Sequence, residues 1–345
     1  MRLRLLGNTG LRVSELCLGT MTFGEDWGWG ATREVSRQIV DAFAEAGGNF
    51  IDTANNYTNG TSETIVGECL RAERERFVVA TKYSLRVQTG NAHDVNLGGN
   101  SRRSMLRSVE KSLRRLNTDY IDLLYLHMWD YTTPVDEVLQ AAQQLVLSGK
   151  VLYFAFSDTP AWVIASALAK AEFHGWPKPA GVQIPWSILD RGVEREVLPM
   201  ARANGLAVLP WGLLESGTLT GKYSQPSGEP RRQKSASDTE VAAGSAVARL
   251  ANEIGRSPAQ VAINWVRQQP GNIIPILGAR TVGQLQDNLG CLDFRLTGEQ
   301  MASLAEVAGF KQGFPNGFLH SDHVRGLIFG ESFARLDWRG MKAEG

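Results

Sequence analysis

The sequence predicts an α/β fold, a (β/α)8 TIM barrel with a short N-terminal β-hairpin and a C-terminal extension. Eight short apolar runs alternate with amphipathic stretches, which is typical of repeated strand–helix units. Runs such as Ile121–Leu126 are almost wholly apolar, as strands buried on both faces are. The GxGxxG fingerprint that a doubly wound dinucleotide-binding sheet normally carries is missing from the chain. We therefore expect one barrel domain over residues 1–345.

The first element is a hairpin. Residues 1–14 alternate polar and apolar side chains around the glycine-containing turn at residues 7–10, so they are expected to form a hairpin cap on the barrel. The eight barrel strands are then expected at Leu16–Gly19, Phe50–Thr53, Phe77–Lys82, Ile121–Leu126, Val151–Phe156, Gly181–Ile184, Ala207–Pro210 and Ile273–Leu277.

Helices are expected between these strands, because the intervening stretches carry apolar residues at helical spacing. They are placed at Arg33–Ala46, Ser62–Arg71, Ser101–Leu116, Val135–Ser148, Pro160–Glu172, Val193–Ala203, as a pair across Glu240–Gln268, and at Val282–Asn288. Residues 309–345 are left as a C-terminal extension.

Charge and composition exclude several classes of protein. The chain has 36 Lys and Arg against 36 Asp and Glu, a net charge of zero, which argues against a nucleic-acid or membrane-surface binder. Zero net charge also removes the electrostatic repulsion between copies of the chain, so a homo-oligomer is one of the alternatives. No secretory leader or membrane span is visible and the 3 cysteines are unpaired in pattern, so a cytoplasmic protein is expected. The pair His320 and His323 has metal-like spacing but no convergent partners, so no metal is expected.

Polar side chains at strand exits predict the chemistry, since the carboxyl ends of barrel strands meet at one face. Asp52, Lys82 and His127 each follow an apolar strand directly, and Tyr57 lies shortly after Asp52. A lysine beside a buried tyrosine is expected to lower the tyrosine pKa from about 10, and an aspartate keeps the lysine charged. A histidine can hydrogen-bond a substrate oxygen. Each residue alone is more often structural, but the four together predict a proton donor facing a carbonyl.

These residues belong to a longer set of ordered motifs. In chain order they read Leu18-Gly19-Thr20-Met21-Thr22-Phe23-Gly24, Phe50-Ile51-Asp52-Thr53-Ala54-Asn55-Asn56-Tyr57, Ser62-Glu63, Ala80-Thr81-Lys82, Asp122-Leu123-Leu124-Tyr125-Leu126-His127, Thr218-Leu219-Thr220-Gly221-Lys222-Tyr223, and Ile274-Pro275-Ile276-Leu277-Gly278-Ala279-Arg280 with Gln284 and Asn288. Over nearly its full length the chain resembles the aldo-keto reductases. It is most similar to their aryl-alcohol-dehydrogenase-like group, and more distantly to the β-subunits of voltage-gated potassium channels.

The resemblance implies hydride transfer between NADPH and an aldehyde or ketone. It makes Tyr57 the general acid, with Lys82 and Asp52 tuning it and His127 orienting the carbonyl. It also implies an extended NADP(H) across the barrel mouth, held by Thr20, Met21, Asp52, Ser157, Asp158, Gln183, Trp211, Gly212, Leu213, Leu214, Gly217, Lys222, Gly278, Arg280, Gln284 and Asn288. Because Arg280 opens a helix and offers a forked donor suited to a 2′-phosphate, NADP is expected rather than NAD.

Two positions depart from the family pattern. The family has Ser-Asn after the fifth strand, where this chain has Ser157-Asp158, and an ionised aspartate cannot donate a hydrogen bond. It also places negative charge near a ring that is positive when oxidised. The family has Ser-Pro-Leu after the seventh strand, where this chain has Gly212-Leu213-Leu214, so the backbone there is free to take another path.

Four aromatic residues and a methionine in the exit loops are candidates for the substrate pocket: Trp27, Trp29, Tyr83, Trp129 and Met128. Such a lining favours a flat or apolar carbonyl substrate. Residues 85–100 and the tail 310–345 could close over it, or the tail aromatics could serve only to pack the tail onto the barrel.

Three functions compete. The first is an NADPH-dependent carbonyl reductase. The second is a cofactor-binding regulatory module with slow turnover, like the channel β-subunits, in which the complete set of four polar residues would be superfluous. The third is a Schiff-base enzyme with Lys82 as nucleophile, which needs a lysine of low pKa. A neighbouring Asp52 would instead raise that pKa, so this function ranks last.

Overall fold

Eight parallel strands form the centre of the molecule. The computed structural model describes residues 1–87, 94–221 and 237–336 of the chain. The strands follow one another around the sheet in sequence order: β3 (Cys17–Gly19), β4 (Phe50–Asp52), β5 (Val78–Tyr83), β6 (Ile121–Leu126), β7 (Val151–Ser157), β8 (Gly181–Pro185), β9 (Ala207–Trp211) and β10 (Ile276–Gly278), with β10 paired to β3. Backbone hydrogen bonds from Val208 to Asn272 and from Ile274 to Val208 close the ring into a barrel.

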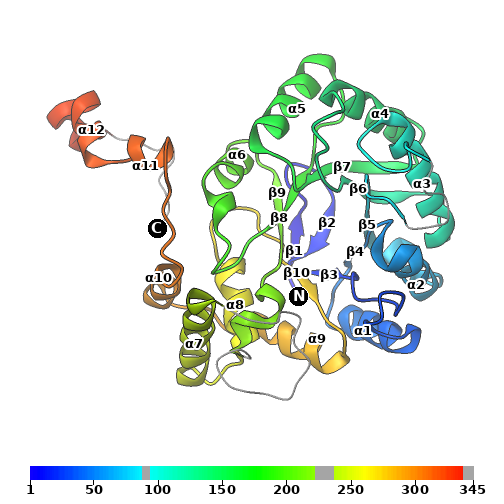
Figure 1. The fold of residues 1–345 in the computed structure, drawn as a ribbon, viewed down its shortest axis with the longest axis horizontal. Helices are drawn as coiled ribbons and strands as arrows, with labels where there is room; N and C mark the ends of the chain where they lie inside the picture. The colour runs from blue at the N-terminus through cyan, green and yellow to red at the C-terminus, as the bar shows by residue number, and fades with distance from the viewer. Residues whose placement is uncertain (88–93, 222–236, 337–345) are drawn as a thin grey trace.

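Helices surround this barrel, as predicted (Figure 1). They are α1 (Arg33–Glu45), α2 (Thr61–Leu70), α3 (Arg102–Leu116), α4 (Val135–Leu147), α5 (Ala161–His174), α6 (Val197–Ala203), α7 (Asp238–Glu253), α8 (Pro258–Arg267) and α9 (Val282–Leu289). Local sequence sets their ends: Ser101 caps α3 by accepting from the backbone N–H of Ser104, and Asn117 ends that helix in the left-handed conformation. Ser257 likewise caps α8 by accepting from the backbone N–H of Gln260, and Pro258 is the first residue of that helix.

Two predicted elements begin more than two residues away from the observed ones. The last strand was expected at residues 273–277, but Pro275 lacks an N–H, and only Ile273 makes an isolated bridge before β10 begins at Ile276. The helix expected at Val193–Ala203 is split into the 3-10 turn η3 (Gly192–Glu194) and α6. The side chain of Glu194 accepts hydrogen bonds from Trp186 and Arg191, which hold that turn apart from the helix.

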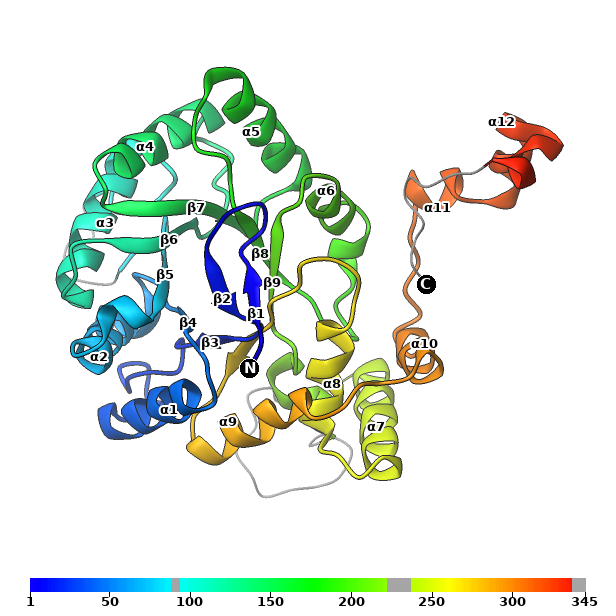
Figure 2. The ribbon, with the colours of Figure 1, turned by 180° about the vertical axis from the view of Figure 1, so that it is seen from behind.

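The hairpin of β1 (Leu3–Leu5) and β2 (Arg12–Ser14) lies across one end of the barrel (Figure 2). Its side chains Leu6 and Val13 are fully buried and join the apolar cluster inside the barrel, which includes Phe50, Leu123 and Leu209. A larger apolar layer fills the space between strands and helices. The hairpin therefore closes the amino-terminal end of the barrel, and the opposite end, where the strands finish, stays open to a ligand.

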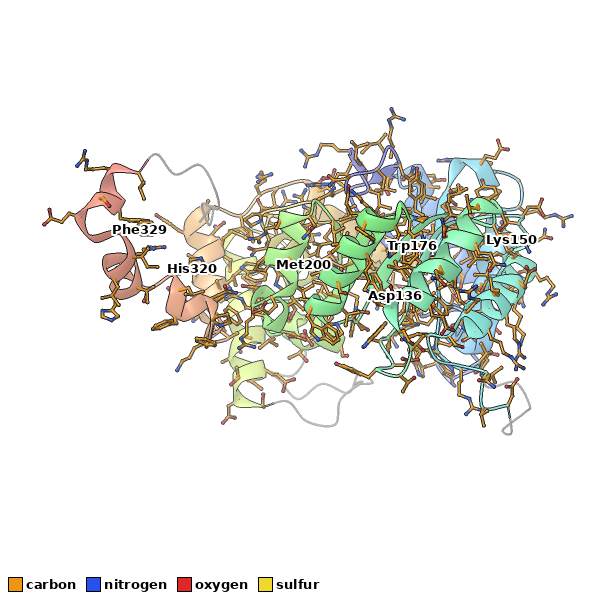
Figure 3. The ribbon with its side chains drawn as sticks, turned by 90° about the horizontal axis from the view of Figure 1, so that it is seen from above. Asp136, Lys150, Trp176, Met200, His320 and Phe329 are labelled. Carbon is orange, nitrogen blue, oxygen red and sulfur yellow. The ribbon has the colours of Figure 1, made fainter. Side chains whose placement is uncertain are left out.

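The C-terminal segment stands off from the barrel. After α10 (Gly298–Glu306), the helices α11 (Asn316–Leu319) and α12 (Asp322–Phe329) and the 3-10 turn η6 (Gly330–Arg335) extend sideways, and Figure 3 shows Phe329 well apart from the barrel. Residues 310–316 attach the segment to the barrel: Phe310 packs against Arg191, Arg195 donates to the carbonyl of Lys311, and Asn316 at the start of α11 donates to the carbonyl of Arg195. Of the two alternatives for the tail, closure over the pocket is not found, because no described tail residue lines the cavity. The packing of tail aromatics onto the barrel is not found for Phe314 and Phe318 either, because both are mostly exposed. No described helix is long and apolar enough to span a bilayer.

Candidate active site

Four polar side chains meet at the carboxyl ends of β4, β5 and β6. Lys82 on β5 donates to Asp52 Oδ2 at 2.6 Å, to the carbonyl of Thr53 at 2.8 Å and to the Tyr57 hydroxyl at 3.0 Å. His127 follows β6, and its ring lies edge-on to the Tyr57 ring with 5.9 Å between centroids. The sequence prediction that these four residues share one site agrees with this arrangement.

Strand alternation decides which neighbour of Lys82 reaches the site. Successive side chains of a strand point to opposite faces, so Lys82 points into the barrel and Tyr83 points out towards the helices. Tyr83 is fully buried, and its hydroxyl donates to the carbonyl of Asn100. The prediction that Tyr83 lines the substrate pocket is therefore wrong, because it placed consecutive residues of one strand on the same face.

The ammonium of Lys82 is held charged. Burial by itself would lower its pKa, but the carboxylate of Asp52 and the phenol of Tyr57 outweigh burial and raise it. A lysine of raised pKa is a poor amine nucleophile, so the Schiff-base function has no support here.

The predicted lowering of the Tyr57 pKa is also wrong. Burial raises the pKa of Tyr57 by more than the adjacent Lys82 lowers it, and the charges of Asp52 and Asp158 raise it further. Tyr57 therefore keeps its proton at neutral pH. A protonated phenol that already touches an ammonium is suited to donating that proton to an oxygen anion, because Lys82 would stabilise the phenolate left behind.

His127 is neutral in this environment. Burial lowers its pKa well below the usual range, and Lys82 lowers it further. Its Nδ1 is buried and has no hydrogen-bond partner among the described residues. A neutral imidazole cannot compete with Tyr57 as the acid at neutral pH, but it can hold a substrate oxygen by a hydrogen bond.

One large cavity opens above these groups. It has a volume of about 720 Å³ and runs from Tyr57 and His127 across the barrel mouth to Arg280 and Asn288. Most of the residues predicted to hold the cofactor line it: Met21, Asp52, Asp158, Gln183, Trp211, Gly212, Leu213, Leu214, Gly217, Gly278, Arg280, Gln284 and Asn288.

Three predicted cofactor residues are not among those lining residues. Thr20 is fully buried and donates to the carbonyl of Asp52 at 3.0 Å, so it supports the wall from behind. Ser157 is buried beside Asp158, and its hydroxyl has no hydrogen-bond partner among the described residues. Lys222 lies outside the described residues.

The substrate end of the cavity is lined by Met128, Trp27 and Leu85. Trp29 does not line it, because its ring packs against Trp27 with 5.8 Å between centroids. Trp129 does not line it either, because its ring packs partly buried against the core beneath the loop after β6. Of the residues predicted to line the pocket, the cavity lining therefore includes Trp27 and Met128 but not Trp29 or Trp129.

A second helix start, which was not predicted from the sequence, also lies at the cavity. Ser257, Pro258 and Ala259, at the beginning of α8, line it together with Asp287 of α9. The Ser-Pro pair is a readable helix-start signal, but nothing in the chain order shows that α8 points at the barrel mouth.

The far end of the cavity is suited to an anionic group. Arg280 lies just before α9, and Thr281 caps this helix by accepting from the backbone N–H of Gln284. The side chain of Gln284 accepts from the backbone N–H of Arg280 at 2.9 Å. The first N–H groups of α9 and the guanidinium of Arg280, which forms no ion pair within the described residues, together favour a phosphate there.

The side chains of Asp158, which follows β7, and Trp211, which ends β9, are also in contact. Trp211 Nε1 donates to Asp158 Oδ1 at 3.3 Å, and the indole is 40% exposed in the cavity wall. Burial raises the pKa of Asp158 to about 6, although the Trp211 hydrogen bond and Lys82 oppose it. After β9 the backbone passes through Glu215, Ser216 and Gly217 with positive φ, so this loop takes a tight, irregular path along the cavity.

The cavity fits an extended dinucleotide. Its volume of about 720 Å³ is in the range of small-molecule sites. Next to its inner end are two buried polar atoms without partners among the described residues, Nδ1 of the lining residue His127 and Oγ of Ser157 behind the lining. Its outer end has Arg280 and the start of α9, which suit an anionic group. Among the described residues no group of three or more His, Cys, Asp or Glu side chains is placed to hold a metal ion.

Comparisons with known proteins agree with this geometry. The model of the "Aldo/keto reductase family" matches residues 15–308. The NADP⁺ aryl-alcohol dehydrogenase of Phanerodontia chrysosporium is 40% identical over 338 residues, covering 90% of this chain and 87% of that protein. A norsolorinic acid reductase of Emericella nidulans is 38% identical over 317 residues, covering 90% of this chain and 82% of that protein.

Proposed function

Since the chain belongs to the aldo/keto reductase family, we propose that the four-residue site at the inner end of the cavity is its catalytic centre. The protein is an NADP-dependent oxidoreductase that reduces the carbonyl group of aldehydes or ketones to an alcohol. The single observation that carries the assignment of residues is the contact of the Lys82 ammonium with both Asp52 and the Tyr57 hydroxyl.

The roles of the residues follow from their protonation. Bound NADPH supplies the hydride. His127, neutral and next to Tyr57, holds the carbonyl oxygen and so presents the carbonyl carbon for attack. Tyr57 donates its phenolic proton to the oxygen as negative charge develops there. Lys82 stabilises the phenolate, and Asp52, which also accepts from Gln183 at 2.9 Å, keeps the ammonium in place.

The same cavity would hold the cofactor. Arg280 and the start of α9 would bind the 2′-phosphate, the loop from Gly212 to Gly217 would follow the pyrophosphate, and Trp211 would lie against the nicotinamide face. Gln284 and Asn288 would contact the adenosine. Ser157, whose buried hydroxyl has no hydrogen-bond partner in the described part of the chain, would contact the carboxamide from behind the cavity lining.

An aromatic carbonyl compound is the substrate class we propose. The substrate end of the cavity is lined by Trp27, Met128 and Leu85, which favours flat apolar molecules over sugars. The printed names of the relatives, aryl-alcohol dehydrogenase and norsolorinic acid reductase, agree with that class. We further propose that residues 1–345 act as one domain and that the protein works in the cytoplasm.

The deciding experiment compares the parent with Tyr57→Phe in NADPH oxidation at 340 nm with an activated aryl aldehyde. Phenylalanine keeps the ring but removes the proton that the carbonyl must receive, so turnover is expected to fall by about 100-fold or more while NADPH still binds. If the parent binds NADPH but oxidises it no faster than Tyr57→Phe across a panel of carbonyl compounds, the reductase proposal is overturned. The cofactor-binding regulatory module would then be the better reading.

A further inference from the structure

Asp158 is a titratable side chain in the cavity that the proposed mechanism does not use. Its backbone is fixed from two sides, since its N–H donates to the carbonyl of Gln183 on β8 and its carbonyl accepts from the N–H of Trp129 after β6. These contacts hold it at a φ of +39°, which is uncommon for a residue other than glycine. The carboxylate is thereby aimed at the Trp211 indole in the cavity wall.

The charge of Asp158 is not neutralised by its surroundings. Lys82 on β5 lowers the pKa of Asp158, but its ammonium is already paired with Asp52 on β4 at 2.6 Å. The other ionisable groups at the inner end of the cavity are Tyr57 and His127. Both are neutral at pH 7, because burial raises the pKa of Tyr57 and lowers that of His127. Asp158 forms no ion pair within the described ranges, and its pKa of about 6 leaves it mostly ionised above pH 7.

The inner end of the cavity has to accept the redox-active ring. Tyr57 delivers the proton to the carbonyl oxygen, and the hydride must reach the carbon of the same carbonyl, so the nicotinamide must lie beside Tyr57. Asp158 and Trp211 form the cavity wall at that end. The nicotinamide ring is neutral in the reduced cofactor and carries one positive charge in the oxidised one.

We propose that the carboxylate of Asp158 makes this cavity discriminate between the two redox states of its cofactor, binding NADP⁺ more tightly than NADPH. The inference rests on the proposed function. An anion within a few ångströms of a cation in a partly desolvated site attracts it strongly, and it has no such attraction for the neutral ring. An ionised carboxylate accepts hydrogen bonds but cannot donate one to the carboxamide oxygen of the cofactor. Asp158 therefore lacks a contact that a hydrogen-bond donor at this position would make with both redox states.

The same attraction would favour carbonyl reduction once NADPH is bound. The hydride carries its electron pair to the carbonyl carbon while the proton of Tyr57 passes to the carbonyl oxygen, so positive charge grows next to Asp158. The carboxylate therefore stabilises the transition state more than the starting complex. The cost is slower release of NADP⁺.

The test measures binding, not turnover. Dissociation constants for NADP⁺ and NADPH are obtained by quenching of tryptophan fluorescence, for the parent, Asp158→Asn and Asp287→Asn, from pH 5.5 to pH 8.5. Asp287 is a matched control, because its carboxylate lines the same cavity at the other end. At pH 8 the ratio Kd(NADPH)/Kd(NADP⁺) is expected to be about tenfold higher in the parent than in Asp158→Asn, and unchanged in Asp287→Asn.

The ratio should also fall as the parent is acidified through the pKa of Asp158. The 2′-phosphate titrates near pH 6 in both nucleotides, so it cancels from the ratio. The variant Asp158→Asn retains Asp52, Tyr57, Lys82 and His127. If one of these groups titrated, the ratio measured for the variant would also change with pH. The asparagine variant should therefore give a nearly flat ratio.

Two outcomes would overturn the inference while leaving the proposed function intact. One is that both nucleotides bind and Asp158→Asn has the parental ratio at pH 8. The other, which applies even if the variant does not fold, is a parental ratio that stays constant from pH 5.5 to pH 8.5. If instead the parent binds neither nucleotide, or never oxidises NADPH with any carbonyl compound, the proposed function itself has failed.

Discussion

The ammonium nitrogen of Lys82 lies 2.6 Å from Oδ2 of Asp52, and both side chains are almost completely shielded from solvent. A buried ion pair of this kind is costly to form and more costly to break, since removing one partner leaves an unpaired charge in a medium of low polarity. In the proposed mechanism the pair has a use that offsets this cost, because it would stabilise the phenolate that remains after Tyr57 gives up its proton.

Lys82→Met is therefore expected to damage both stability and activity. It leaves the Asp52 charge unpaired and should lower the free energy of unfolding by about 3–5 kcal/mol, measured by urea denaturation. Activity should fall by about 100-fold or more. The double variant Lys82→Met/Asp52→Asn removes the unpaired charge, so it should regain most of the stability but none of the activity. Recovery of both would mean that Lys82 has only a structural role.

Arg280→Gln should separate the two nicotinamide cofactors. The guanidinium faces the cavity at the start of α9, where it would contact the 2′-phosphate that NADPH has and NADH lacks. The Kd for NADPH is expected to rise by about 10- to 100-fold, with the Kd for NADH unchanged. Arg325→Gln, on the outlying α12, serves as the control and should change neither. An equal loss for both cofactors would contradict the assignment.

Asp158→Asn should stabilise the folded protein at alkaline pH. Burial raises the folded-state pKa of Asp158 to about 6, above the usual aspartate value of about 4, so the ionised form is disfavoured in the fold. The penalty is full above about pH 6 and fades as the pH falls towards the unfolded value near pH 4. At pH 8 the asparagine variant should be more stable by about 2 kcal/mol, and its advantage should shrink at pH 5.

The measurement is urea denaturation of parent and variant at pH 8, 6 and 5. Asparagine keeps an oxygen that can accept from Trp211, so the hydrogen bond itself is not lost. A variant less stable than the parent at pH 8 would show that the carboxylate is stabilising in the fold and that burial does not govern its pKa.

A substitution in the cavity should change substrate kinetics, whereas one in the tail should not. Phe318 of α11 is 53% exposed on the segment that stands off from the barrel, so Phe318→Ala should leave kcat and KM for an aryl aldehyde within about twofold. Met128 lines the cavity, so Met128→Ala should raise KM several-fold by removing apolar contact. A raised KM in Phe318→Ala would support closure of the tail over the pocket.

Much of this protein could be predicted from local patterns. All eight barrel strands and the helices between them lie near their expected positions, because apolar periodicity and capping residues act over a few neighbours. The meeting of Asp52, Tyr57, Lys82 and His127 was also predictable, because one rule of barrel geometry brings strand exits to one face. The outlying helices α11 and α12 could not be predicted in this way, because they are too short to show a clear apolar periodicity.

The errors arose where a side chain's surroundings matter more than its position in the chain. Tyr83 was assigned to the pocket although the alternation of a strand turns it away from Lys82. The Tyr57 pKa was expected to fall because Lys82 is close, whereas burial by the surrounding barrel has the larger effect. Burial is a sum over contacts from distant parts of the chain, and no single segment encodes it.

The sequence by itself determined the order of strands and helices, the identity of the polar residues at the strand exits, and the presence of an aspartate at position 158. The tertiary structure alone decided which of these residues face the cavity, how strongly each is desolvated, and that the carboxylate of Asp158 meets the indole of Trp211. The physical reason is range: capping and periodicity act between neighbours, whereas desolvation and charge pairing depend on residues that only the closed barrel brings together.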